Sequence, residues 1–178
     1  MIAASPEIQT PRLRLRWITK NDAPLMLAVW NDPDFIRHVG DRGIRSEEEA
    51  AQALQEGVLK LYEECGYGPY VVSSKSDGKA MGICGLFKRD NLPDPDIGYG
   101  FLPEFCAHGY AIEAAREVVA HARNVMQLSK ILAIVSPGHE RSISLLEKLG
   151  MAAEGTVRMP GEDKDLLLYT LTLKSQTK

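Results

Sequence analysis

Residues 96–115 decide the fold: Asp96-Ile-Gly-Tyr-Gly-Phe-Leu-Pro-Glu-Phe-Cys-Ala-His-Gly-Tyr-Ala-Ile-Glu-Ala-Ala115. The first residues are apolar or aromatic as far as Leu102, and Pro103 ends the strand that they predict. Gly109 then opens an Ala-rich helix. Backbone N–H groups at a helix start have no partner in the helix and lie at the positive end of its dipole. The stretch therefore indicates a phosphate site, although many such connections bind nothing.

The composition is that of an ordinary globular protein. The 178 residues are 44% hydrophobic and 25% charged, with a net charge of −3, so we expect a single domain over residues 1–178. No basic run suits a nucleic-acid backbone. No stretch is apolar enough to span a membrane, and the first residues lack a signal-peptide pattern, so we expect a cytoplasmic protein.

Cysteine and histidine spacing gives no metal signature. Cys65, Cys84 and Cys106 form no Cys-x-x-Cys pair, and the four histidines form no His-x-x-x-His pair. The sequence therefore predicts neither a zinc site nor a disulfide framework, and free thiols suit a reducing compartment.

Periodicity and turn residues predict the order of elements. We expect strand 12–17, a helix capped by Asn21 or Asp22, a loop over 37–45, helix 46–64, strands 70–74, 80–88 and 97–102, helix 109–125, strand 131–135, a helix ending at Gly150, and strands 151–159 and 166–173. In helix 109–125, the predicted buried face holds Ala111, Ala115, Val118, Ala122 and Val125, and the predicted solvent face holds Glu113, Arg116, Glu117 and Arg123. The crossover through this helix predicts one parallel strand pair in a mixed sheet.

Three segments together resemble the GNAT N-acetyltransferases, most closely the RimJ/RimL-like branch. Thr10–Arg16 looks like the opening strand of that branch, and Cys106–Ala111 occupies the acetyl-CoA motif. Ser142–Met151 is similar to the second family signature. Cys106 stands where the family usually has Gln or Arg, and His139 where it usually has Asn.

The resemblance implies an α+β GNAT fold with a mixed, mostly antiparallel sheet, splayed central strands and flanking helices. It also implies acetyl-CoA as the donor, with pantetheine and pyrophosphate held mainly by the main chain. The cofactor-binding residues that it implies are Phe101, Leu102, Pro103, His108, Gly109, Tyr110, Ala111, Ile112, Glu113 and His139.

The implied reaction is direct attack of an amine on the acetyl thioester, which needs a base, an oxyanion donor and a proton for the thiolate. Asp96 is our predicted base, with a solvated strand-end carboxylate as the alternative interpretation. The tyrosine that many GNAT enzymes use as acid is replaced here by Leu146. Ser142 is the nearest polar candidate, unless it simply caps its helix. A backbone N–H near Phe101 is the expected oxyanion donor.

The acceptor is expected to be a small-molecule amine or a protein N-terminal α-amine. Candidate acceptor-binding residues are Asp41, Arg42, Tyr67, Arg89 and Tyr99. We expect a monomer or a homodimer. Two rival hypotheses stay open: a GNAT domain that senses acyl-CoA without turnover, and a phosphate-binding fold that uses another nucleotide.

Overall fold

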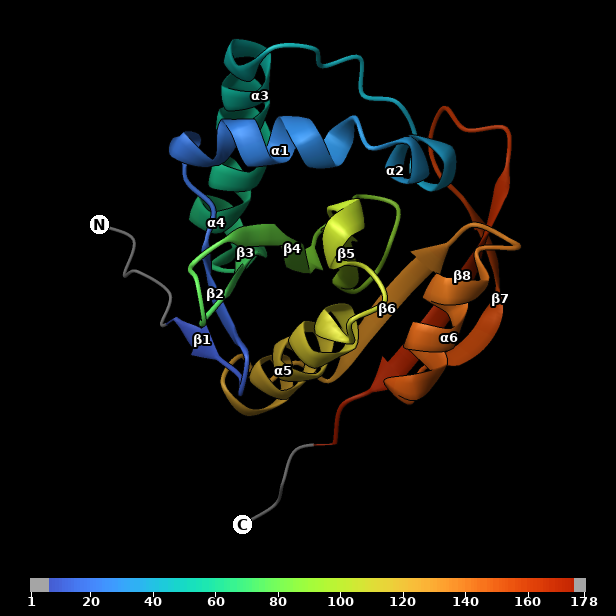
Figure 1. The fold of residues 1–178 in the computed structure, drawn as a ribbon. Coiled ribbons are helices and arrows are strands. Elements are labelled where there is room, and N and C mark those ends of the chain that lie inside the picture. Colours follow the sequence, from blue (N-terminus) through green and yellow to red (C-terminus); the bar gives the residue numbers. More distant parts are fainter. Residues whose placement is uncertain (1–6, 175–178) are drawn as a thin grey trace.

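The computed structural model describes residues 7–174 as one sheet with helices on both faces (Figure 1). In this part of the chain the strand order is β1-β2-β3-β4-β5-β6-β8-β7. The strands are β1 (Ile8–Gln9), β2 (Leu13–Trp17), β3 (Pro69–Ser74), β4 (Ala80–Phe87), β5 (Asp96–Phe101), β6 (Lys130–Val135), β7 (Ala152–Arg158) and β8 (Asp165–Thr172). Neighbours are antiparallel except β5 and β6, which are parallel. The predicted α+β class and mixed sheet are confirmed.

The helices form two layers, one on each face of the sheet (Figure 1). The first layer holds α1 (Ala23–Trp30), α2 (Pro33–His38), α3 (Glu47–Leu54) and α4 (Lys60–Cys65), and the second holds α5 (Tyr110–Asn124) and α6 (Glu140–Lys148). A π-helical turn, Gln55–Leu59, joins α3 to α4, so the predicted helix 46–64 is present with this irregularity.

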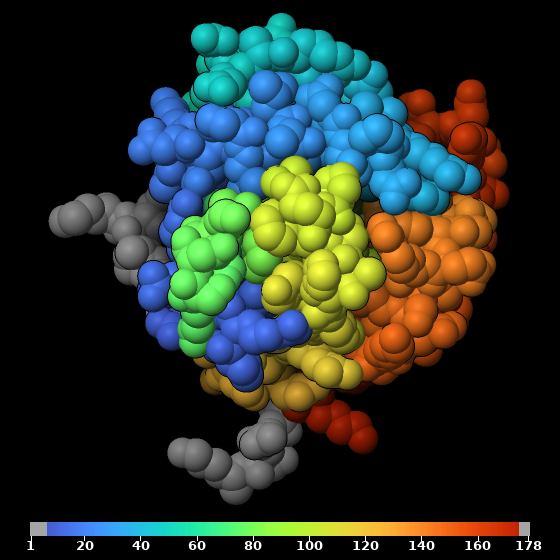
Figure 2. Space-filling view, in the orientation of Figure 1, coloured from blue at the N-terminus to red at the C-terminus, as the bar shows by residue number. Residues whose placement is uncertain are grey.

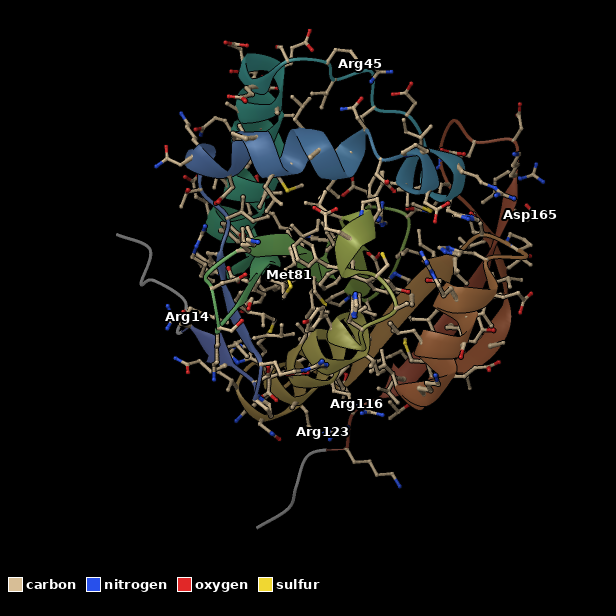
Figure 3. All side chains as sticks on the ribbon, viewed as in Figure 1. Arg14, Arg45, Met81, Arg116, Arg123 and Asp165 are labelled. Atoms are coloured by element: carbon tan, nitrogen blue, oxygen red, sulfur yellow. The ribbon has the colours of Figure 1, made fainter. Side chains whose placement is uncertain are left out.

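The sheet separates two hydrophobic clusters. Successive residues of β3 point to opposite faces, so Val71 packs with α1 and α3 while Val72 packs with α5. Met81 is 1% exposed, whereas Arg14 and Arg116 point outward (Figure 3). Each helical layer therefore buries its apolar face against one side of the same sheet.

The central strands diverge. β5 pairs with β4 along its whole length, from Gly82↔Phe101 to Phe87↔Asp96. β5 and β6 share a single register pair, Asp96↔Leu132, whereas the other edge of β6 pairs with β8 from Lys130 to Val135. The predicted splayed strands are confirmed, and the gap between them opens toward the carboxyl ends of both strands.

The structure corrects the predicted faces of α5. Val125 is 62% exposed because α5 ends at Asn124, so Val125 lies beyond the helical stripe. Glu113 does not face water: its side chain is 17% exposed and hydrogen-bonds the loop before β2. The buried face is Ala114, Ala115, Val118, Val119 and Ala122.

Besides two short 3₁₀ turns, Lys20–Asp22 and Pro103–Phe105, two elements of residues 7–174 were not predicted. Helix α2 begins in a stretch to which no element was assigned and ends inside the predicted loop 37–45; the Asp32 carboxylate caps it by accepting from the Phe35 amide at 3.1 Å. Pro33 then occupies its first turn, where the missing N–H costs nothing. The other is β1, a two-residue edge strand paired with β2.

Candidate functional site

A cleft of about 550 Å³ follows the gap between the diverging strands. One wall is β5 with the start of α5, the opposite wall is α6, and the α1–α2 segment closes one end. Figure 2 shows the surface near residues 100–112 (yellow) between α1–α2 (blue) and α6 (orange). The cleft is therefore a direct consequence of the splay.

Gly109 forms the turn at the start of α5. Its φ of +79° is a left-handed conformation that side-chain-bearing residues rarely adopt, and an added Cβ would lie 3.3 Å from Arg12 Nη2. Arg12 Nη1 in turn donates to the His108 carbonyl at 3.0 Å. The turn is thus fixed by Gly109 and by Arg12, which comes from the loop before β2.

Glu113 also ties this turn to the loop before β2. Its carboxylate accepts from Thr10 Oγ1 and Arg12 Nε, both at 2.6 Å. Burial would raise the pKa of Glu113, but the hydrogen bonds from Thr10 and Arg12 hold it below its usual value. The Glu113 amide donates to the Gly109 carbonyl at 3.2 Å, so it is already used within the helix.

The remaining amides of the first turn have no acceptor within α5, as at any helix start. They belong to Tyr110, Ala111 and Ile112, and these residues line the cleft together with Gly109. Neither His108 nor Glu113 lines it. Four of the six residues predicted for the pyrophosphate turn are therefore brought to the cleft.

The predicted pantetheine residues lie at the end of β5. Phe101 and Pro103 line the cleft, whereas the Leu102 amide donates to the Met81 carbonyl of β4 at 2.9 Å. Because neighbouring residues of a strand point to opposite sides, the Phe101 amide faces the gap with β6. Cys106 also lines the cleft, with its Sγ atom 3.6 Å from the Leu102 carbonyl.

Tyr99 of β5 and Ser142 of α6 join the two walls. Their hydroxyl oxygens lie 2.5 Å apart and both residues line the cleft. Burial raises the pKa of Tyr99, although the hydrogen bond with Ser142 opposes the shift, so the phenol is neutral at neutral pH. Leu146, at the position of the missing tyrosine, is buried in the core.

Asp96 is not among the residues that line the cleft. It begins β5, is 1% exposed, and accepts from Arg89 Nε at 3.1 and 3.0 Å through its two oxygens. Burial raises the pKa of Asp96, and the Arg89 charge opposes that shift. Asp96 is therefore not a solvated strand-end carboxylate, and its role as the base stays a prediction.

The other predicted acceptor residues also lie outside the cleft lining. Asp41 accepts from Arg45 Nη2 at 2.6 Å, and the Arg42 guanidinium stands 4.8 Å from the centre of the Trp30 ring. Burial and the positive charge of Arg89 lower the pKa of Arg42. Of the five predicted acceptor residues, Tyr99 alone lines the cleft.

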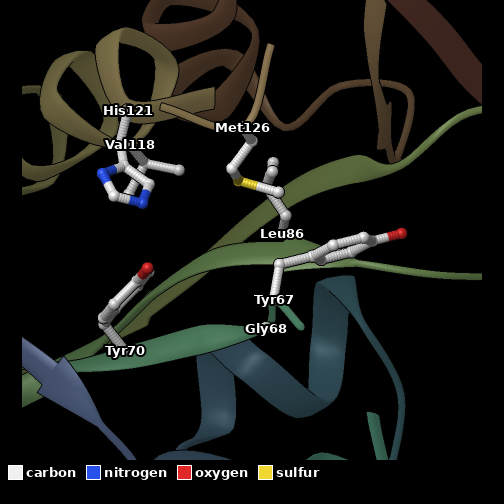
Figure 4. Close-up of a pocket in the computed structure, with 7 residues that line it drawn as sticks. All are labelled: Tyr67, Gly68, Tyr70, Leu86, Val118, His121 and Met126. Carbon is white, nitrogen blue, oxygen red and sulfur yellow. The ribbon is translucent and has the colours of Figure 1, made fainter. Parts of the chain in front are cut away.

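Tyr67 lines a second, much smaller cavity of about 10 Å³, room for roughly one water molecule (Figure 4). Tyr70 of β3 and His121 of α5 face one another across it, with ring centroids 6.5 Å apart. Burial raises the pKa of Tyr67 to about 12 and lowers that of His121. This cavity is too small for a substrate.

One cleft feature was missed from the sequence. His38, at the end of α2, stacks on His139 with ring centroids 3.7 Å apart and an interplanar angle of 7°. Both residues line the cleft. Asp32-Pro33, a cap followed by a first-turn proline, was the signal that could have revealed α2, but no pattern in the sequence pairs the two rings.

Over residues 7–174, no group of three His, Cys, Asp or Glu side chains is arranged to hold a metal ion. In the same part of the chain, no helix has the length and apolar character to cross a membrane.

Comparisons with known proteins agree with these features. The model of a family described as acetyltransferase (GNAT) domain matches residues 12–152. YoaA of Bacillus subtilis (strain 168), named an uncharacterized N-acetyltransferase, is 30% identical over 154 residues, covering 86% of each chain.

Two solved structures share the fold. An acetyltransferase from Agrobacterium tumefaciens has a TM-score of 0.79 at 21% identity and covers 96% of each chain. RimL, a ribosomal L7/L12 alpha-N-protein acetyltransferase solved in complex with coenzyme A, has a TM-score of 0.79 at 17% identity and covers 94% of this chain and 98% of RimL.

Proposed function

Because the chain belongs to the GNAT acetyltransferase family, we propose that it transfers the acetyl group of acetyl-CoA directly to a primary amine. The family implies acetyl-CoA as the donor. The observation that carries the proposal is the cleft between β5 and β6, with the first turn of α5 at its wall.

The donor would bind mainly through the main chain. Pyrophosphate oxygens would accept hydrogen bonds from the amides of Tyr110, Ala111 and Ile112, where the helix dipole also favours negative charge. Gly109 supports this role because its turn leaves the approach to these amides free of a side chain. The pantetheine arm would run along Phe101 in the gap that β6 leaves.

The chemical end would lie where Tyr99 meets Ser142. The Phe101 amide would stabilise the negative charge that develops on the thioester oxygen. The hydrogen-bonded hydroxyl groups of Tyr99 and Ser142 would supply the proton for the departing thiolate. This pair compensates for Leu146, which has no proton to give.

The acceptor would be a primary amine, and the α-amine of a protein or peptide is the preferred candidate. An α-amine has an unperturbed pKa of about 8 and a lysine amine about 10.4, so the α-amine loses its proton more readily. RimL acts on an α-amine of L7/L12, by its printed name, which supports the same class here. Arg42 and Arg89 would attract a carboxylate on such an acceptor.

The test is CoA release from acetyl-CoA with a panel of amines: peptides with free α-amines, lysine peptides with blocked N-termini, and small amines. We expect release with at least one α-amine peptide, together with a mass shift of that peptide. Tight acetyl-CoA binding without release from any amine would favour the sensor hypothesis. A thermal shift with ATP or NAD but none with acetyl-CoA would overturn the donor assignment.

A further inference from the structure

The two histidines in the cleft wall come from separate elements. His38 ends α2, and His139 stands immediately before α6. The Ser136 hydroxyl donates to the His38 carbonyl at 2.7 Å, which ties the end of α2 to the loop between β6 and α6. The imidazole stack is therefore held by a contact outside the rings themselves.

The cleft needs a proton acceptor for the incoming amine, and its carboxylates already have partners. Asp32 accepts from the Phe35 amide, and Asp34 lies 3.3 Å from Arg141 Nη2. Asp96 is outside the cleft lining and paired with Arg89. Imidazole is the side chain whose ordinary pKa, about 6.5, best suits proton transfer near neutral pH.

Resting on the proposed acetyl transfer, we propose that His139 is the general base that takes a proton from the acceptor amine, and that His38 positions its ring. His139 precedes Ser142 by three residues, so the two lie on the same side of the first turn of α6. Ser142 in turn meets Tyr99. The base and the proton donor would thus stand about one helical turn apart on the same wall of the cleft.

The protons balance as follows. The acceptor ammonium gives one proton to the imidazole of His139, and the freed lone pair attacks the thioester carbon. The carbon–sulfur bond then breaks, and the thiolate takes a proton from the Tyr99–Ser142 pair. The nitrogen of the new amide loses its second proton, which restores that pair, and His139 returns its proton to water.

The surroundings of His139 keep it in the neutral, proton-accepting form. Burial lowers its pKa, and so do the charges of His38 and Arg37 on the α2 side and Arg141 on α6, while Asp34 opposes them. A positive charge on the stacked His38 ring would repel a proton on His139. The base form therefore persists to a lower pH than in a free histidine.

The experiment compares His139→Ala, His38→Ala and His121→Ala with the wild type. His121 is a matched control, because it is also partly buried with a lowered pKa but lies in the small cavity beside Tyr70 (Figure 4). The probe acceptor is the peptide with a free α-amine that releases CoA fastest in the panel. The readouts are kcat against pH, acetyl-CoA affinity, and recovery of activity by added imidazole.

For His139→Ala we expect kcat to fall about 100-fold at neutral pH, with acetyl-CoA affinity retained. In the profile of kcat against pH of this variant, the acid limb should move to higher pH, toward the pKa of the acceptor amine. Added imidazole should restore part of the rate. His38→Ala should give a smaller loss, and His121→Ala should match the wild type. His139→Asn, which carries the residue usual in the family, guards against a folding defect.

The outcomes separate this inference from the proposed function. If the wild type releases no CoA with any amine, the proposed function fails and the inference falls with it. If the wild type is active, but the acid limb and kcat of both His139 variants are unchanged, the inference alone is overturned. Loss of kcat without a shifted limb or imidazole rescue would make His139 structural, which also overturns it.

Discussion

The donor side and the acceptor side of this molecule are built in different ways. The donor side is main-chain geometry: β5 and β6 part after the pair Asp96↔Leu132, and Gly109 turns the chain into α5. The proposed acceptor side would rely on side chains such as Arg42 and Arg89, which come from the loops after α2 and β4 and lie outside the cleft lining. Main-chain geometry follows from strand ends, glycines and helix starts, and these can be predicted from sequence. Side-chain placement in loops depends on packing between distant segments.

The largest expected effect tests the main-chain side of this comparison. Gly109→Val would add a β-branched side chain at φ +79°, beside Arg12 and the first-turn amides. We expect acetyl-CoA affinity to fall about 100-fold, or about 2.8 kcal/mol, the magnitude of losing one or two charge-assisted hydrogen bonds. Isothermal titration calorimetry measures this directly.

The matched control for that variant is Gly66→Val. Gly66 has a similar φ of +71°, with open space around its Cβ position, and it follows α4. Both variants should lose comparable stability from backbone strain, but Gly66→Val should keep its affinity for acetyl-CoA. Equal losses of acetyl-CoA affinity in the two variants would show that backbone strain causes the loss, and not a blocked approach to the amides of Tyr110–Ile112.

The next effect tests whether the two walls of the cleft act together. Ser142→Ala removes the hydroxyl that meets Tyr99. We expect kcat to fall about 30-fold with little change in acetyl-CoA affinity, since a thiolate is a good leaving group that needs moderate acid assistance. Tyr99→Phe should give a similar loss, and the double variant should lose little more because the pair acts as a unit.

Ser144→Ala is the control. Ser144 is on the same helix, but the hydroxyl group that Tyr99 contacts is that of Ser142. Steady-state kinetics of all four variants checks the comparison. Additive losses from Ser142→Ala and Tyr99→Phe would contradict a shared proton-donating role.

A smaller effect tests the side-chain half of the molecule. Arg42→Ala should raise the KM of a carboxylate-bearing acceptor about tenfold, the loss of one charge-assisted contact, while acetyl-CoA affinity stays the same. Arg45→Ala in the same loop is the control, because Arg45 is already paired with Asp41 at 2.6 Å. If the two variants have equal KM values, Arg42 does not contact the acceptor.

The smallest effect concerns Asp96. Because burial raises its pKa, the protonated carboxyl group favours the folded state, and this contribution to stability is lost as the pH rises through the raised pKa. Asp96→Asn stays neutral, so relative to this variant the free energy of unfolding of the wild type should fall as the pH rises above about 4, the ordinary pKa of a carboxyl group. Urea unfolding at a series of pH values from acid to neutral measures the difference.

In the same variant kcat should stay within about twofold of the wild type, because the cleft does not include Asp96. A much larger loss of kcat, with a shifted pH profile, would restore Asp96 as the base and count against His139.

The sequence predicted the fold well where local patterns decide it. The strand that ends before Pro103, the glycine-opened helix α5 and the helix that ends at Gly150 were predicted from local patterns, and the structure contains all three. The splay of the central strands was implied by the family resemblance and is also present. The place of β8 in the sheet could not be predicted. It lies between β6 and β7, and this order depends on which strands far apart in the sequence pair with each other.

The site was predicted less completely, for a physical reason. In the sequence, nothing distinguishes Asp96 from a free carboxylate at the start of a strand. Its partner Arg89 is brought to it only by the fold of the loop before β5. His38 has no pattern of its own, since the stack with His139 exists only after α2 packs against the β6–α6 loop. Contacts between residues far apart in the chain leave no local trace in the sequence.

The most direct test of the central claim is amide hydrogen exchange of the wild type with and without acetyl-CoA. The account predicts slower exchange at Phe101 and at Tyr110–Ile112 when acetyl-CoA is added, and unchanged exchange in β7. ATP at the same concentration should give no such protection. Unchanged exchange at these amides in the presence of saturating acetyl-CoA, or equal protection by ATP, would contradict the account.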